Sequence, residues 1–277
     1  MAVLPPTVIL VASWIAGSAL SAPARALVGN LPSDLIGTSV EFPSASGATP
    51  HGWLIPGQRG KGAVVLMHGV RANRLSMIDR ARFLARAGYT VLLFDFQAHG
   101  ESSGNHITFG YRESMDAQSA AMYLRANAPG ERVGVIGVSM GGAAAVLTSP
   151  PLEVKAMVLE MVYPTADQAI SNRLTSRFGI AGKLLVPLLA WQLRPRLGVS
   201  ANELRPIDKV GQLSAAKLFI AGSEDKYTPL NESRQLFAAA QNPKEFWIVN
   251  GAGHEDLYRI ESREYERRVL DFFSRYL

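Results

Sequence analysis

A serine enclosed by glycines stands where a strand pattern gives way to a helix pattern. The stretch VGVIGVSMGGAAAVL, Val133 to Leu147, changes at Ser139 from β-branched apolar residues to small ones. A tight turn between strand and helix would present the hydroxyl at its tip, beside the free N–H groups of the helix N-terminus. Those groups can stabilise a developing oxyanion. The pattern G-x-S-x-G, from Gly137 to Gly141, therefore predicts a nucleophilic serine.

Other uses of a glycine-rich turn fit these residues less well. A dinucleotide-binding fingerprint needs glycine where Ile136 and Ser139 stand, and a phosphate-binding loop needs Lys-Ser or Lys-Thr after its glycines. The alternative that stays open is structural, with Ser139 only capping the helix that follows. Because serine is a weak nucleophile near neutral pH, the catalytic interpretation also requires a base and an acid that orients it.

Two later segments supply a candidate base and a candidate acid. His254 lies in NGAGHEDL, directly after the last apolar strand, and Asp225 lies in IAGSEDKYTP, after the preceding strand. Both are expected at the edge of the sheet to which Ser139 points, and the chain order Ser, Asp, His is the one expected for this arrangement. Glu224 is the adjacent rival for the acid. Glu160, at the end of an earlier strand, is a second rival.

The loop after the strand VVLM is expected to complete the site. We expect the backbone N–H groups of Val70 and Met140 to form an oxyanion hole. His68 is then a structural residue held by hydrogen bonds. Asp95 and His99, in FDFQAHGES, resemble a catalytic pair but are expected to shape a loop below the site. The two remaining histidines, which have no evident partner, are His51 and His106.

The amino-acid composition excludes several kinds of active site. The chain of 277 residues has no cysteine, which excludes disulfides, thiolate catalysis and cysteine-based zinc sites. The histidines lack metal-ligand spacing, so we predict no metal and no cofactor. The net charge of +5 comes from basic residues without a long run of like charge, which predicts a solvated surface and no nucleic-acid partner. The residues considered for that surface are Arg71, Arg74, Arg80, Arg82, Arg173, Arg177, Arg194, Arg196, Arg267 and Arg268.

Apolar strand patterns and amphipathic helix patterns alternate from Leu35 onward. Strands that are apolar on both faces indicate a mostly parallel sheet covered by helices on each side. GTSVEFPS and PHGWLIPG predict an N-terminal hairpin. The alternation is interrupted at about residues 166–208, a stretch too long for a simple crossover, which we interpret as a helical cap over the C-terminal edge of the sheet.

The first thirty residues form a separate segment. Thr7 to Leu20 is an apolar core of signal-peptide length, followed by A-x-A-like patterns ending at Ala24 or Ala26. Three interpretations stay open: a cleaved signal, an uncleaved membrane anchor, and a helix packed on the protein. The first two predict export or membrane association through residues 1–26, and they do not exclude a cytoplasmic location.

Taken together, these motifs resemble the α/β-hydrolase superfamily. The resemblance is carried by HGVRANR, FDFQAHGES, GVSMGG, GSEDKYTP and GAGHED, in order, and covers nearly all the chain after the N-terminal segment. It is similar to the serine aminopeptidase-like and prolyl-oligopeptidase-like branches, which include esterases, lipases and peptidases. It implies a hydrolase domain at residues 31–277, a twisted sheet of about eight strands, and an acyl-enzyme mechanism with the triad Ser139, Asp225 and His254.

Three functions remain in competition. A carboxylesterase acting on a small-molecule ester is the first, because the leucine-rich part of the cap, Ile180 to Trp191, would give an apolar acyl pocket; packing within the cap is the other interpretation of those leucines. An aminopeptidase or amidase would need an acid to hold the substrate amine, and Glu160 and Asp167 are the candidates. A catalytically silent, membrane-tethered module is the third. The sequence does not specify an oligomeric state.

Overall fold

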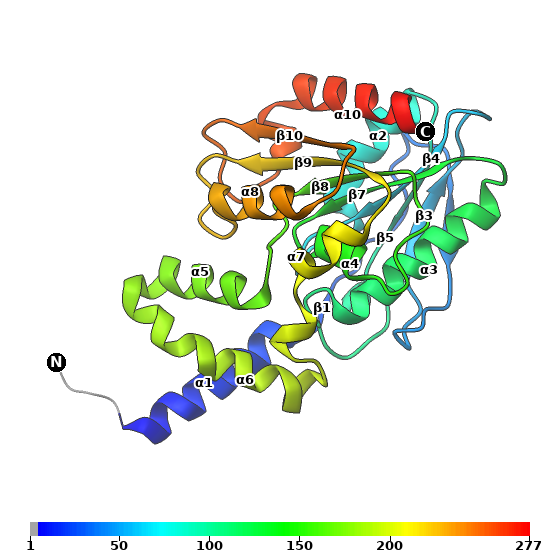
Figure 1. Ribbon diagram of the computed structural model, residues 1–277. Coiled ribbons are helices and arrows are strands. Elements are labelled where there is room, and N and C mark those ends of the chain that lie inside the picture. Colours follow the sequence, from blue (N-terminus) through cyan, green and yellow to red (C-terminus); the bar gives the residue numbers. More distant parts are fainter. Residues whose placement is uncertain (1–4) are drawn as a thin grey trace.

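An eight-stranded sheet forms the centre of the protein, as the computed structural model, which describes residues 5–277, shows (Figure 1). Its strand order is β10-β9-β8-β7-β4-β5-β3-β2. The strands are β2 (Thr38–Glu41), β3 (His51–Ile55), β4 (Ala63–Met67), β5 (Thr90–Phe94), β7 (Val133–Val138), β8 (Ala156–Glu160), β9 (Ala216–Gly222) and β10 (Lys244–Val249). The predicted α/β-hydrolase fold class is confirmed.

The sheet is parallel except at one edge. Strand β3 pairs antiparallel with both β2 and β5, and every other neighbouring pair is parallel. The predicted N-terminal hairpin is therefore the β2–β3 pair. All residues of β4, β8 and β9 are buried, which explains why these segments are apolar without alternation.

Helices cover both faces of this sheet (Figure 1). The side chains of α2 and α10 pack on one face, and those of α3, α4 and α8 pack on the other. The helices are α2 (Ile78–Arg86), α3 (Tyr111–Asn127), α4 (Met140–Leu147), α7 (Pro206–Lys209), α8 (Leu230–Ala239), α9 (Leu257–Ile260) and α10 (Ser262–Tyr276), with short 3₁₀ turns at η1 (Arg74–Met77) and η4 (Val210–Gln212). Helix α2 ends where expected, with Gly88 at a φ of 90° just past its C-cap.

A group of helices lies between β8 and β9, at the place where a cap is expected, and residues 166–208 are called the cap segment below. The cap segment projects beyond the end of the sheet (Figure 1). Its elements are α5 (Ala166–Phe178), η2 (Gly179–Leu185), α6 (Val186–Leu197) and η3 (Ala201–Glu203), followed by α7.

The N-terminal segment forms α1 (Pro6–Ser21), which packs against α6 (Figure 1). Arg196 of α6 donates to the Trp14 carbonyl at 2.8 Å, and its guanidinium carbon lies 4.2 Å from the Trp14 ring centroid. After α1, β1 (Ala24–Arg25) pairs with β6 (His99–Gly100) in a separate two-stranded sheet. Within residues 5–277, no helix has both the length and the apolar character needed to cross a membrane. Residues 1–4 of the predicted signal or anchor lie outside the described part of the chain.

Candidate active site

The turn from β7 into α4 holds Ser139 in a strained backbone conformation. Its φ is 50°, a value uncommon for residues other than glycine. The Ser139 N–H donates to the Glu160 carbonyl at 2.8 Å, and the Ser139 carbonyl accepts the first helical bond, from Ala143. A Cβ on Gly141 would lie 2.4 Å from the Met67 carbonyl oxygen, and one on Gly137 only 2.5 Å from a backbone atom of the same turn. The flanking glycines are therefore required by close backbone approach.

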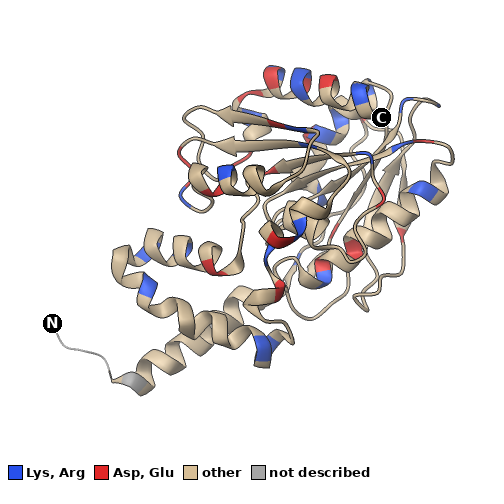
Figure 2. Cartoon of the chain, viewed as in Figure 1, with Lys and Arg blue, Asp and Glu red and all other residues tan. Residues whose placement is uncertain are grey.

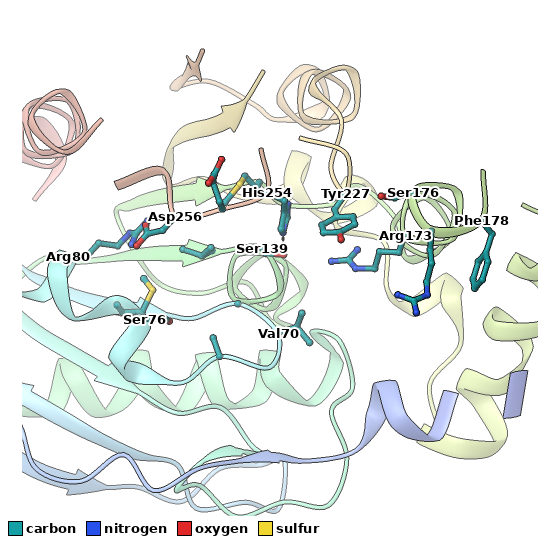
Figure 3. Close-up of a pocket in the computed structure, with 17 residues that line it drawn as sticks. Val70, Ser76, Arg80, Ser139, Arg173, Ser176, Phe178, Tyr227, His254 and Asp256 are labelled. Atoms are coloured by element: carbon teal, nitrogen blue, oxygen red, sulfur yellow. Dashed lines mark hydrogen bonds and ion pairs between the residues drawn. The ribbon is translucent and has the colours of Figure 1, made fainter. Parts of the chain in front are cut away.

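Ser139, His254 and Asp225 form a continuous hydrogen-bonded chain. The Ser139 hydroxyl lies 3.1 Å from Nε2 of His254, and Nδ1 of that ring lies 2.7 Å from Oδ2 of Asp225 (Figure 3). The other oxygen of Asp225 accepts the backbone N–H groups of Tyr227 and Thr228 at 2.7 and 2.8 Å. This carboxylate is thus fixed by three partners. The structure brings together the three residues that the sequence singles out.

Neither rival acid approaches the histidine. Glu224 is exposed, and Glu160 is fully buried on the far side of the Ser139 turn. Both Glu160 oxygens are already bonded: Arg80 donates to them at 3.0 and 2.7 Å, and the Tyr265 hydroxyl donates at 2.5 Å. Burial lowers the pKa of the Arg80 guanidinium, but the neighbouring Glu160 carboxylate raises it further, so Arg80 stays charged. Glu160 is a structural acid beneath the site.

Two backbone N–H groups beside Ser139 have no acceptor among residues 5–277: those of Val70 and Met140. Met140 is the first residue of α4, where an N–H group has no partner within the helix. The Gly69–Val70 loop adjoins the serine, since a Cβ on Gly69 would lie 3.8 Å from the Ser139 Cβ. Both donors therefore lie next to the serine, where an oxyanion could accept from them.

A cavity of about 1050 Å³ opens above Ser139 and His254, as Figure 3 shows. Strand-end loops line one side, and α5 of the cap segment lines the other. The lining from the cap segment consists of Arg173, Ser176, Arg177 and Phe178.

The leucine-rich part of the cap segment does not line this cavity, so the predicted apolar acyl pocket built from Ile180 to Trp191 is wrong. Leu184 is 80% exposed and Trp191 67% exposed. The physical reason is that α6 packs against α1 and away from Ser139, while α5 lies over the site. Trp191 lies beside Trp14 of α1, with ring centroids 6.5 Å apart, and Leu188 lines the same contact between α1 and α6.

Comparison with known proteins places the chain in a family. The model of a family described as "Alpha/beta hydrolase family" matches residues 64–267. The chain belongs to the α/β-hydrolase family. Its sequence is 24% identical over 242 residues to the uncharacterized protein YqkD of Bacillus subtilis, covering 86% of this chain and 79% of that protein. It is 28% identical over 263 residues to the Arabidopsis thaliana alpha/beta hydrolase domain-containing protein WAV2, covering 88% and 80%.

Solved structures have the same fold as this α/β hydrolase. The Pyrococcus furiosus esterase Pf2001 superposes with a TM-score of 0.76 at 22% identity, covering 93% of this chain and 98% of that one. An esterase from Exiguobacterium antarcticum superposes with a TM-score of 0.63 at 16% identity, covering 86% of this chain and 100% of that one. At these identities the likeness concerns the fold.

His68, His99 and Asp95, the other residues that the sequence singles out in this α/β hydrolase, have structural roles. His68 is fully buried, with Nδ1 2.7 Å from the Gly69 carbonyl oxygen and Nε2 accepting the Phe96 N–H at 3.1 Å. His99 accepts the Arg71 N–H through Nε2 at 3.0 Å and so supports the loop that carries Val70. Asp95 pairs with the buried Arg74. As expected, these residues shape the loops below the site.

Sequence reasoning missed the arginines inside this α/β hydrolase. The sequence predicts Arg74 and Arg80 on the solvated surface with the other basic residues, but they are only 3% and 1% exposed. Arg173 is half-buried in the cavity, near the ring of Tyr227. That assignment is wrong for these three because it rested on spacing along the chain, while a buried arginine is identified by partners distant in sequence. The absence of acidic residues between Asp167 and Glu203 is the signal that could have drawn attention to Arg173.

Proposed function

We propose that this α/β hydrolase cleaves carboxylic esters of small molecules through a serine acyl-enzyme intermediate. The single observation that carries the proposal is the chain from the Ser139 hydroxyl through His254 to Asp225, with contacts of 3.1 and 2.7 Å. Two free N–H groups beside the serine add support, because acyl transfer needs donors for the developing oxyanion. The similarity in fold to an esterase from Pyrococcus furiosus is consistent with the ester class.

The first half-reaction forms the acyl-enzyme. Nε2 of His254 takes the Ser139 proton as the oxygen attacks the ester carbonyl, and the N–H groups of Val70 and Met140 donate to the resulting oxyanion. Asp225 accepts the Nδ1–H bond, which holds the tautomer with a free Nε2 and stabilises the imidazolium. As the tetrahedral intermediate collapses, His254 gives its proton to the leaving alcohol and the bond from carbon to that alcohol oxygen breaks.

The second half-reaction releases the acid. Water gives a proton to His254 and attacks the acyl carbon, and the bond to the Ser139 oxygen then breaks as that oxygen regains its proton. No step needs an oxidant, a reductant or a metal ion. The residues of the chain therefore account for both halves of the reaction.

The aminopeptidase alternative loses the residues it depended on. Glu160 is saturated by Arg80 and Tyr265, and Asp167 is not part of the cavity lining. The cavity instead contains arginines from α5, which repel a protonated amine. The silent-module alternative has no specific observation in its favour, because the hydrogen-bonded chain of all three side chains is complete.

The proposal also covers the limits of the hydrolase domain and the role of the N-terminal segment. We assign the hydrolase domain to residues 31–277, with the cap inserted at about 166–208. Export or membrane association through residues 1–26 stays a prediction. Mass analysis of the mature N-terminus in the native host tests it, since cleavage would leave a chain starting after Ala24 or Ala26.

Covalent labelling tests the proposed function directly. We expect a fluorophosphonate probe to label the protein at Ser139, and Ser139→Ala to remove both labelling and hydrolysis of p-nitrophenyl esters, by at least about 10³-fold in kcat/KM. Ser176→Ala is the matched control, because Ser176 lines the same cavity on the cap side. Labelling retained in Ser139→Ala, or hydrolysis of no ester in a panel of rising acyl length, would contradict the proposal.

A further inference from the structure

Arg173 is a cation in the substrate cavity without a carboxylate partner. Within residues 5–277, no carboxylate oxygen lies within 4.0 Å of its guanidinium, whose one hydrogen bond is a 3.3 Å contact to the carbonyl of Ala169 one helical turn earlier. The buried Arg80, which also reaches the cavity, is different, since it is paired with Glu160 and with Asp256 at 2.9 Å. Arg173 therefore keeps donors that the protein itself does not use.

The free guanidinium lies close to the reacting groups. Its central carbon is 5.2 Å from the ring centroid of Tyr227, and that ring is 5.6 Å from the ring of His254. In Figure 3 the Arg173 side chain extends from α5 beneath Tyr227, on the side of the cavity that faces Ser139. A substrate bound in this cavity with its carbonyl at Ser139 can therefore extend a chain toward the guanidinium.

The Asp225 carboxylate acts on the charge of Arg173 from beyond ion-pair distance and is itself bonded to His254, Tyr227 and Thr228, so the guanidinium has no direct ion-pair partner among residues 5–277. Burial lowers the pKa of its guanidinium, although arginine remains charged in proteins. Figure 2 shows basic but no acidic residues along α5 and α6 after the start of α5. The acids of the cavity lie on the opposite wall, where Asp256 binds Arg80, and Glu255 accepts the Gly253 N–H at 3.1 Å.

We propose that the ester hydrolysed at Ser139 carries a carboxylate group that Arg173 binds. The planar guanidinium offers two parallel N–H donors that match the two oxygens of a carboxylate. Arg177, from the next turn of α5 in the same cavity, adds positive charge at the cap side. The inference rests on the proposed function and specifies its substrate class.

Matched pairs of chromogenic esters test the inference and show on which side of the ester the anion lies. In the first pair, mono-p-nitrophenyl suberate, whose acyl chain ends in a carboxylate, is compared with methyl p-nitrophenyl suberate, whose chain ends in a neutral ester. In the second pair, the octanoyl ester of hydroxynitrobenzoic acid, with a carboxylate on the leaving group, is compared with p-nitrophenyl octanoate. We expect the anionic member to have the higher kcat/KM in at least one pair.

Variants of Arg173 assign that preference to the residue. Arg173→Gln is expected to lower kcat/KM for the preferred anionic ester about 10- to 100-fold, the effect of one charge-assisted contact, and to leave its neutral partner within about threefold. Arg173→Lys should recover part of the loss because it keeps the charge. Arg263→Gln is the control, since Arg263 is exposed on α10 and has no ion pair among the described residues.

Two failures are distinguishable. No anionic preference in either pair, or equal losses for charged and neutral esters in Arg173→Gln, overturns this inference while Ser139-dependent hydrolysis of neutral esters continues to support the proposed function. If no ester is cleaved and the fluorophosphonate does not react, the proposed function fails and this inference with it.

Discussion

Acid sensitivity of folding is predicted from His68, the buried histidine below the active site. Its ring is fully buried, and Nε2 serves as an acceptor for the Phe96 N–H at 3.1 Å, a contact that only an unprotonated Nε2 can make. Burial, with the nearby His99 as a smaller contributor, lowers the pKa of His68 to about 3. In the unfolded chain the same group has a pKa of about 6.5.

The sign and size of the effect follow from these two pKa values. Between pH 6.5 and pH 3 the unfolded chain binds a proton at this position and the folded chain does not, so the free energy of unfolding decreases as the pH falls. Linkage with these values gives a loss of about 2 kcal/mol between pH 7 and pH 5 from this residue alone.

Urea denaturation of the wild type and of His68→Gln at both pH values measures this loss. Glutamine does not titrate, and its amide can donate to the Gly69 carbonyl as the imidazole does. We expect the wild type to lose about 2 kcal/mol more than the variant on acidification. Equal losses in the two proteins would refute the argument that His68 is neutral and strongly shifted in the folded state.

Two further predictions concern the support beneath Ser139. Glu160→Gln should lower the free energy of unfolding by up to about 3–5 kcal/mol, because the buried Arg80 loses the more buried of its two carboxylate partners. Glu153→Gln, which breaks an exposed pair with Arg125, should lower the free energy of unfolding by less than about 1 kcal/mol when measured by denaturation. Equal losses in the two variants would refute the distinction between the buried and the exposed ion pair. Gly141→Ala should cost about 3 kcal/mol and reduce ester hydrolysis, because its Cβ would meet the Met67 carbonyl oxygen at 2.4 Å, whereas Gly253→Ala, with its nearest contact at 3.6 Å, should unfold like the wild type. A Gly141→Ala protein as stable and active as the wild type would contradict the close approach of Gly141 to the Met67 carbonyl oxygen.

The sheet and the meeting of Ser139, Asp225 and His254 could be predicted because each depends on local pattern and one topological rule. A strand buried on both faces is a continuous apolar run, and the C-terminal ends of parallel strands meet at one edge. Each candidate residue directly follows such a run. The sequence leaves Glu224 as a rival to Asp225, and in the structure it is the Asp225 carboxylate that bonds to His254, while Glu224 is exposed.

The lining of the cavity could not be predicted in the same way. The leucines between Ile180 and Trp191 have the composition of a pocket wall, but which side of the cap segment faces Ser139 depends on where α1 packs. The burial of Arg80 depends on Glu160, which is 80 residues away in sequence. Arg173 faces the cavity because α5 crosses it. These features are set by tertiary contacts that no short stretch of sequence encodes.

The small sheet formed by β1 and β6 constrains the timing of any N-terminal processing. The Ala24 N–H donates to the Ala98 carbonyl at 2.8 Å and the Ala26 N–H donates to the Gly100 carbonyl at 3.0 Å, so both candidate cleavage positions lie in backbone that is already paired. A peptidase binds its substrate as an unpaired extended strand, which this backbone cannot offer once the loop around His99 has formed. Removal of α1 therefore requires β1 to be unpaired from β6, either before the chain folds or by local opening of this two-stranded sheet.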